Sequence, residues 1–189
     1  MDQIAIYFLW AAWVMSWMAA ALWSSRTKGH APFGEELISR VFTILGGLML
    51  FGIYSPRYVS VLTLWHVDLQ TGWFLVGLTA AGFAFSWWAR IYLGNLWSSS
   101  VTVKEGHHVV DTGPYRFVRH PIYTGIIVAS FATAIDKGTY VALAGALLML
   151  VGWFIKARVE ERFLRAELGA QAYDAYAQKT AMLVPFVRV

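Results

Sequence analysis

The chain has 189 residues, of which 58% are hydrophobic and 14% are charged, whereas soluble domains average about 45–50% apolar and about 25% charged residues. This composition excludes intrinsic disorder and argues against an ordinary water-soluble globule. The 10 Trp, 9 Tyr and 12 Phe suit a chain that meets a lipid–water interface. Because cysteine is absent, disulfides, thiolate nucleophiles, Cys-ligated zinc and iron–sulfur clusters are excluded.

Apolar runs along the chain predict membrane-spanning helices, because a bilayer core about 30 Å thick needs roughly 20 apolar helical residues. The first run has no charged residue inside it and no basic residue before it, and it is longer than the apolar part of a signal peptide. The second run ends near Pro56, where proline stops or bends a helix. We therefore expect about five spans, over residues 4–23, 41–54, 72–89 with an extension to 93, 122–135 and 139–155.

The last two runs are separated only by Asp136, Lys137 and Gly138. Such a short gap predicts a turn, and the two runs should pack as an antiparallel helical hairpin. Since the fourth run is short, we expect its helix to begin near Pro121.

The basic residues indicate how the spans are oriented. Of the 15 Lys and Arg residues, only Arg57 and Lys137 lie outside the segments 24–40, 90–120 and 156–189. The positive-inside rule places these three segments in the cytoplasm and the N-terminus outside, which agrees with an odd number of spans. The net charge of +4 is explained by these membrane flanks, and we expect no nucleic-acid partner.

The cytoplasmic side holds two polar stretches, the loop 94–121 and the tail from Lys156. Two roles are open for the tail: an amphipathic helix lying on the headgroups, or a segment that closes over the loop to form a pocket. We expect Gly169 to interrupt the helix and Pro185 to end it. The helix itself is predicted by apolar residues three and four positions apart, namely Val159, Phe163, Ala166, Ala170, Tyr173 and Ala177.

The histidines of the loop do not have the spacing of a zinc site. His107 and His108 are adjacent and no His-x₃-His pair occurs, so we expect no metal even with Glu160 or Glu161 nearby. P-loop, dinucleotide and nucleophile-elbow signatures are also absent.

Two short motifs have both a structural and a functional interpretation. Taken alone, Arg119-His120-Pro121 marks a membrane edge, where the arginine reaches the headgroups and the proline starts a helix. Glu160-Glu161 is either part of an ion-pair cluster with the basic residues around it or a carboxylate site for a cationic ligand. The basic residues are Lys156, Arg158, Arg162 and Arg165.

Read together, two blocks of the sequence resemble the isoprenylcysteine carboxyl methyltransferase family of integral membrane methyltransferases. The resemblance covers residues 94–189, about half of the chain. The first block contains Gly94-Asn95-Leu96-Trp97-Ser98, Lys104 to Val110, Thr112 to Arg116 and Arg119 to Tyr123; the second contains Glu160-Glu161, Leu164, Leu168-Gly169, Tyr173, Tyr176 and Val184-Pro185.

The resemblance implies an all-α, multi-pass membrane protein that binds S-adenosyl-L-methionine between the cytoplasmic loop, the hairpin and the tail. No catalytic residue is assigned. Lys156 stands where the animal enzymes have a substrate-binding arginine, and lysine cannot make the same two-pronged contact with a carboxylate; Arg158 is an alternative, and Glu161 would contact an amine lipid. The implied cofactor contacts are His107, His108, Val109, Val110, Tyr115, His120, Pro121, Ile122, Tyr123 and Glu160.

We therefore expect N-terminal transmembrane helices over residues 1–93 and a catalytic half over residues 94–189. The expected activity is methylation of a lipid-like substrate that enters from the bilayer, such as the carboxyl group of a prenylcysteine or of a related hydrophobic acid. The alternatives are a phospholipid or amine-lipid methyltransferase, a membrane reductase that uses NADPH, and a non-catalytic scaffold or transporter subunit. Few polar residues lie within the spans, which argues against a transporter.

Overall fold

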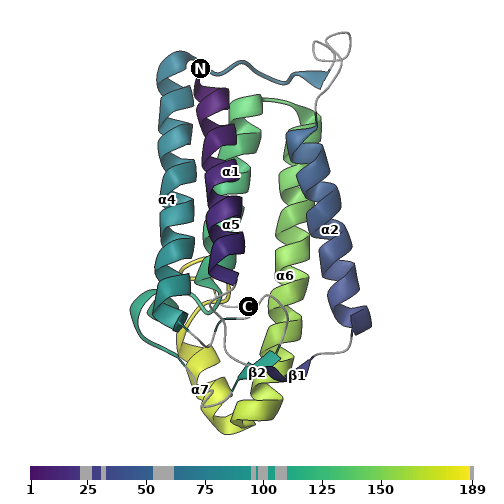
Figure 1. The fold of residues 1–189 in the computed structure, drawn as a ribbon, viewed down its shortest axis with the longest axis vertical. Coiled ribbons are helices and arrows are strands. Elements are labelled where there is room, and N and C mark those ends of the chain that lie inside the picture. The colour runs from purple at the N-terminus through teal and green to yellow at the C-terminus, as the bar shows by residue number, and fades with distance from the viewer. Residues whose placement is uncertain are drawn as a thin grey trace.

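The computed structural model describes residues 1–21, 27–30, 33–52, 62–94, 97, 102–104 and 110–187. Within them, five long helices run side by side, and a shorter helix folds back next to the lower end of the longest (Figure 1). The elements are α1 (Asp2–Ala21), β1 (Thr27–His30), α2 (Phe33–Phe51), α4 (Leu69–Leu93), β2 (Thr102–Lys104), the 3₁₀ helix η2 (Gly113–Arg116), α5 (Pro121–Lys137), α6 (Tyr140–Leu168) and α7 (Ala170–Lys179).

Each predicted apolar run overlaps one of the five long helices, while residues 22–23 and 53–54 of these runs lie outside the described residues. The prediction of a helical, membrane-like protein is confirmed. In the described part of the chain, α1, α4 and α6 are long and apolar enough to cross a membrane. The remaining two long helices are α2 and α5. Helix α2 begins at Phe33, ahead of the predicted apolar run, and its first turns were not part of that run because they are polar. Helix α5 has 17 residues.

The predicted hairpin joins α5 and α6. Gly138 ends α5 in the left-handed conformation at φ 61°, and its N–H donates to the carbonyls of Ala134 and Ile135. The Thr139 side chain then accepts from the N–H of Ala142 and so begins α6. Glycine is required at this turn for a second reason, because a Cβ on Gly138 would lie 2.2 Å from the carbonyl oxygen of Trp65.

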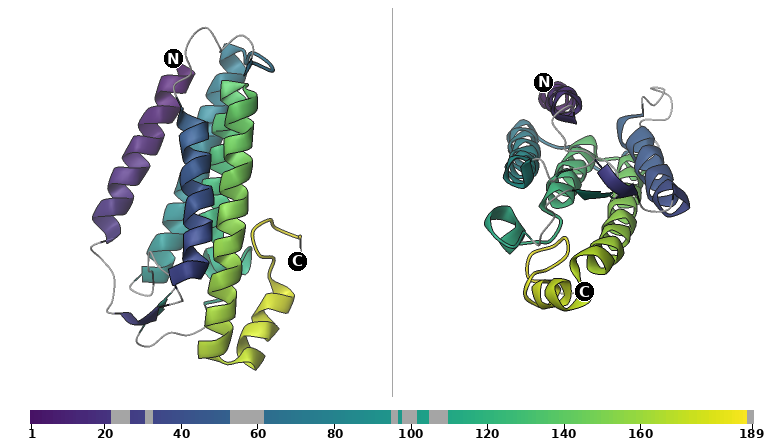
Figure 2. Two further views of the ribbon diagram at one scale, coloured as in Figure 1. Left: turned by 90° about the vertical axis from the view of Figure 1, so that its right-hand side faces the viewer. Right: turned by 60° about the horizontal axis from the view of Figure 1, so that its bottom comes forward.

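The helices form a layer in the order α4, α5, α6 and α2, with α1 covering α4 and α5 from one side (Figure 2). The backbones approach closely at glycines: a Cβ on Gly82 would lie 2.6 Å from the Gly125 oxygen, and one on Gly46 would lie 2.6 Å from the Gly145 oxygen. Small residues at a crossing allow such close packing in membrane helices. In this way α4 packs closely on α5, and α2 packs closely on α6.

The structure adds a small antiparallel ribbon to the all-α prediction. Strand β1 pairs with β2, with Thr27 opposite Lys104 and His30 opposite Thr102. Neither short strand has an alternating apolar pattern, so the sequence offered no signal for them. The ribbon joins residues 27–30 to residues 102–104, and β2 contacts α6. We call this end of the bundle the basic end; it holds 27–30, 102–104, 110–120 and 156–187.

Gly169 interrupts the tail helix as predicted, with φ 91° between α6 and α7. The prediction that Pro185 ends the helix is wrong, because α7 ends earlier, at Lys179, and Thr180 is already extended. The chain leaves the helix there in order to pair with the segment that precedes α5, as described next.

Candidate active site

The tail is attached to the segment that leads into α5. The N–H of Arg119 donates to the carbonyl of Ala181 at 2.8 Å, and the N–H of His120 donates to the carbonyl of Met182 at 3.1 Å. Val118 and Ala181 form a parallel bridge and are both buried. Of the two roles considered for the tail, these contacts favour closure over the loop.

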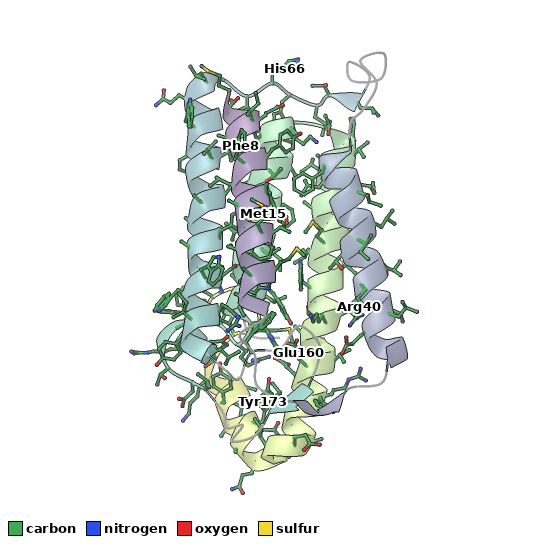
Figure 3. All side chains as sticks on the ribbon, in the orientation of Figure 1. Phe8, Met15, Arg40, His66, Glu160 and Tyr173 are labelled. Carbon is green, nitrogen blue, oxygen red and sulfur yellow. The ribbon has the colours of Figure 1, made fainter. Side chains whose placement is uncertain are left out.

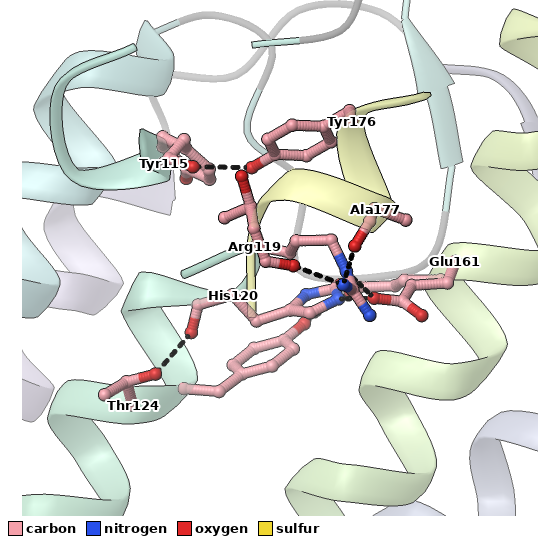
Figure 4. Close-up of polar contacts among 10 residues, drawn as sticks. Tyr115, Arg119, His120, Thr124, Glu161, Tyr176 and Ala177 are labelled. Atoms are coloured by element: carbon pink, nitrogen blue, oxygen red, sulfur yellow. Dashed lines mark hydrogen bonds and ion pairs between the residues drawn. The ribbon is translucent and has the colours of Figure 1, made fainter. Parts of the chain in front are cut away.

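Arg119 is buried at the centre of this junction (Figure 4). Its Nε lies 2.5 Å from Glu161 Oε1 on α6, and its Nη1 donates to the carbonyls of Ala177 at 3.0 Å and Thr180 at 2.5 Å. The interpretation of Arg119 as a residue that reaches the headgroups is therefore wrong. A buried guanidinium requires a charge partner and acceptors for its donors, and α6 and α7 supply both.

His120 lies between two carboxylates. Its Nδ1 is 3.4 Å from Glu160 Oε2 and its Nε2 is 3.3 Å from Glu161 Oε1, and the side chain is 7% exposed. Burial by itself lowers the pKa of His120, but the hydrogen bonds and charges of Glu160 and Glu161 outweigh it, so the pKa is raised above its usual 6.5. Two acceptors facing both ring nitrogens call for the protonated imidazolium, which donates from each.

An aromatic wall extends from His120 along the hairpin. The Tyr123 ring stacks on His120 at 5.4 Å between centroids and on Trp153 at 4.7 Å. The Tyr123 hydroxyl donates to Glu160, and Lys156 Nζ lies 5.6 Å from the Tyr123 and Trp153 ring centroids. This arrangement, which we call the His120–Glu160 cluster (His120, Tyr123, Trp153, Lys156 and Glu160), joins the two sequence blocks in space.

Trp153 was not predicted as a site residue. A signal was nevertheless present, because Trp153, Lys156 and Glu160 are three and seven positions apart and so share one face of a helix. Figure 3 shows Glu160 at the lower part of the bundle, toward the basic end.

The other predicted cofactor contacts lie around the cluster or outside the described residues. Tyr115 is buried on η2; its hydroxyl donates to the Ala89 carbonyl at 3.5 Å and its own carbonyl accepts from Tyr176 at 2.7 Å. Pro121 and Ile122 form the buried first turn of α5, and Val110 packs against the core. His107, His108 and Val109 lie outside the described residues.

A cavity of about 610 Å³ lies on a neighbouring face of α6, toward α7. The three predicted substrate contacts are divided between the two places, since Lys156 lies in the cluster while Arg158 and Glu161 line the cavity. Among the described residues, no group of three or more His, Asp or Glu side chains is arranged to hold a metal ion. The cavity is lined by Arg119, Arg158, Glu161, Arg162, Arg165, Tyr173, Asp174, Ala177 and Gln178.

The structure is that of a helical, membrane-like protein with a buried polar cluster toward one end of the bundle. Residues 75–166, from α4 through the hairpin to Glu160 and Glu161, match the model of the isoprenylcysteine carboxyl methyltransferase (ICMT) family. The chain belongs to this family.

Its curated relatives include two kinds of methyltransferase. Methanethiol S-methyltransferase 1 of Bradyrhizobium diazoefficiens is 36% identical over 162 residues, which are 78% of this chain and 53% of the relative. Protein-S-isoprenylcysteine O-methyltransferase A of Arabidopsis thaliana is 37% identical over 89 residues, 46% of this chain and 44% of the relative. The chain thus spans about half the length of these relatives.

Proposed function

We propose that this protein is a membrane methyltransferase that uses S-adenosyl-L-methionine to methylate a lipid-like substrate, with carboxyl O-methylation of a prenylcysteine-type or related hydrophobic acid as the principal reaction. Family membership supports the reaction class. The observation that carries the site assignment is the contact of the two sequence blocks, where His120 Nδ1 lies 3.4 Å from Glu160 Oε2.

The side chains of the cluster fit the chemistry of this cofactor, which when bound supplies an electrophilic methyl group on a sulfonium. Glu160 is an acceptor for an ammonium or for ribose hydroxyls, and protonated His120, whose two ring nitrogens face Glu160 and Glu161, holds the Glu160 carboxylate in place. Tyr123 and Trp153 offer flat apolar surface for adenine. We propose that Tyr115, Val110, Pro121 and Ile122 complete the site, together with His107, His108 and Val109.

The contribution of the protein to methyl transfer is positional. An in-line displacement accelerates when the reacting groups are held in near-attack geometry and water is excluded. Residues 181–183 are buried against the start of α5, where Thr124 donates to the Leu183 carbonyl at 2.7 Å. This contact closes one side of the cluster and fixes the position of His120, so the tail serves as a wall of the site.

Lys156 is the basic residue best placed to attract an acidic substrate, because it lies beside the aromatic wall of the cluster. An amine lipid would be repelled by Lys156 and would require Glu161 instead. A small thiol is a second candidate acceptor, because the relative that covers 78% of this chain is named as a methanethiol methyltransferase.

We further propose five spans with the basic end in the cytoplasm. Helix α5, at 17 residues, is roughly 26 Å long at 1.5 Å per residue, close to the thickness of the hydrocarbon core. In α2 the proposed span is the apolar part that follows its polar first turns. The charge distribution along the sequence supports the orientation.

The experiment that tests the function is a radiolabelled methyl-transfer assay on the purified protein. We expect transfer from S-adenosyl-L-methionine to a synthetic prenylcysteine, with methanethiol and total membrane lipids assayed in parallel. We also expect S-adenosylhomocysteine to raise the melting temperature and NADPH to leave it unchanged. Stabilisation by NADPH alone would assign the protein to the reductase class instead.

A further inference from the structure

The cavity between α6 and α7 has an excess of positive charge. Its lining contains four arginines and two carboxylates. Both carboxylates already pair with arginines of the same lining: Arg119 Nε lies 2.5 Å from Glu161, and Arg165 contacts both oxygens of Asp174 at 2.7 and 2.8 Å. The formal charges of the lining residues sum to two positive units.

The arginines of α6 are spaced to act on one ligand. Arg158, Arg162 and Arg165 are four and three positions apart, so they share one face of the helix. Glu160 and Lys156 lie on another face, toward Tyr123. The cavity is therefore a separate place from the His120–Glu160 cluster, although Glu161 and Arg119 stand between them.

The guanidinium group favours anions that carry paired oxygens. Its planar set of donors matches phosphate or carboxylate oxygens in pairs, which a lysine cannot reproduce. The lining also includes Tyr173, which is buried, and Gln178, which is exposed. A volume of about 610 Å³ lies in the range of small-molecule sites and accommodates a phosphorylated headgroup.

The depth of the cavity agrees with a lipid headgroup as the source of the phosphate. The apolar part of α6 ends near residue 155, and at 1.5 Å per residue Arg158 and Arg162 lie about 5 Å and about 10 Å beyond it. The headgroup layer occupies roughly 5–8 Å on each side of the hydrocarbon core. These guanidiniums therefore stand at or just outside the layer where lipid phosphates are found.

We propose that the cavity between α6 and α7 is a binding site for a phosphate group, presented by an anionic phospholipid of the adjoining leaflet. The site goes beyond methyl transfer and does not depend on it. An anionic lipid bound there fastens α7, and with it the tail that reaches Arg119, to the membrane surface.

The test measures lipid binding directly on the full chain purified in detergent. Dioctanoyl phosphatidylglycerol, dioctanoyl phosphatidylcholine and inorganic phosphate are titrated separately, with melting temperature and calorimetry as readouts. We expect phosphatidylglycerol to bind and stabilise, and phosphatidylcholine to do so at least tenfold more weakly. If inorganic phosphate binds as tightly as phosphatidylglycerol, the natural ligand is a free phosphate; if it binds only weakly, the ligand is the lipid.

The control separates a built site from general attraction to a charged surface. We expect R158Q/R162Q to weaken phosphatidylglycerol binding at least tenfold, and R158Q alone to weaken it several-fold. Arg116 is exposed at the same basic end but does not line the cavity, so R116Q should leave the affinity unchanged. Equal weakening in R116Q, or wild-type affinity in the double variant, would overturn the proposal. Because all three arginines are exposed, the melting temperatures without lipid should stay within a few degrees of wild type.

Discussion

Two charged side chains that are neighbours in the sequence, Arg119 and His120, are both buried and both reach carboxylates of α6. Neither charge would be stable there alone, because burial disfavours the charged form of each. Glu160 and Glu161 face them from α6, while Tyr123 and Lys156 stand on the other side of Glu160. The charges of Arg119, His120, Glu160 and Glu161 therefore stabilise one another as a set. Removal of any one of them leaves its partner uncompensated.

The protonated state of His120 makes the stability of the fold dependent on pH. Since its pKa is raised above 6.5 in the folded state, its stabilising contribution is complete below about pH 6.5 and is lost as the pH rises through the folded pKa. We expect the melting temperature of the wild-type protein to fall over that window and that of His120→Gln to fall less. Thermal denaturation in detergent at a series of pH values checks this, and parallel curves for the two proteins would contradict it.

Glu160 is the carboxylate that we assign to the cofactor. Replacing it by glutamine keeps the size of the side chain and an acceptor for Tyr123 but removes the charge. Since a hydrogen bond to a charged group is worth about 1.5–3 kcal/mol, we expect Glu160→Gln to weaken S-adenosyl-L-methionine binding about 10- to 100-fold. The control is Glu167→Gln, an exposed carboxylate of the same helix. Isothermal calorimetry gives both affinities, and an unchanged affinity in Glu160→Gln would remove Glu160 from the site.

At the scale of the elements, the hairpin of α5 and α6 determines where both sequence blocks lie. Its turn could be predicted from Asp136, Lys137 and Gly138, and its first residue from Pro121, because turn and cap signals are local. The pairing of residues 181–182 with 119–120 could not, since it joins backbone groups about 60 residues apart and leaves no periodic pattern. Burial of Arg119 was missed for the same reason, because its partners are carbonyls and a carboxylate from distant elements.

The turn itself provides a stability prediction. Gly138→Ala places a Cβ at φ 61° and 2.2 Å from the Trp65 oxygen. We expect a loss of at least about 1–2 kcal/mol from the left-handed conformation alone. A matched change is Gly77→Ala in α4, where a Cβ meets nothing within 4 Å and helix propensity improves by up to about 1 kcal/mol. Melting temperatures of the two variants should move in opposite directions, and a Gly138→Ala protein as stable as wild type would refute the turn geometry.

At the scale of the whole molecule, the layer of α4, α5, α6 and α2 places the His120–Glu160 cluster toward one end, while residues 62–68 lie at the other, beside the α5–α6 turn. The apolar runs allowed the helices and their common direction to be predicted. The order of the helices in the layer could not be predicted, because it depends on close backbone crossings such as Gly82 with Gly125. The division of the chain at residue 93 into N-terminal helices and a catalytic half remains a prediction about function. It does not mark a structural boundary, because α4 and α2 pack on the hairpin.

The proposed orientation can be tested because the sequence has no native cysteine. His66 and Gln178 are exposed. Gln178 belongs to α7, and His66 and α7 lie toward opposite ends of the bundle (Figures 1 and 3). In intact cells, a membrane-impermeant maleimide should label His66→Cys, whereas Gln178→Cys should react only after the membrane is opened. Labelling of Gln178→Cys in intact cells would reverse the topology.

The two carbonyls held by Arg119 belong to the last turn of α7 and to the residue that follows it. The last carbonyls of a helix have no N–H partner within that helix. The Arg119 guanidinium, from a distant part of the chain, therefore caps the C-terminal end of α7. If Thr180 and Ala181 became helical, the two carbonyl oxygens would be withdrawn from the Arg119 side chain. The Ala181 carbonyl would also move away from the backbone N–H of Arg119, which donates to it. Substitutions at 180 and 181 that raise helix propensity would therefore loosen Arg119 from Glu161 without altering either residue.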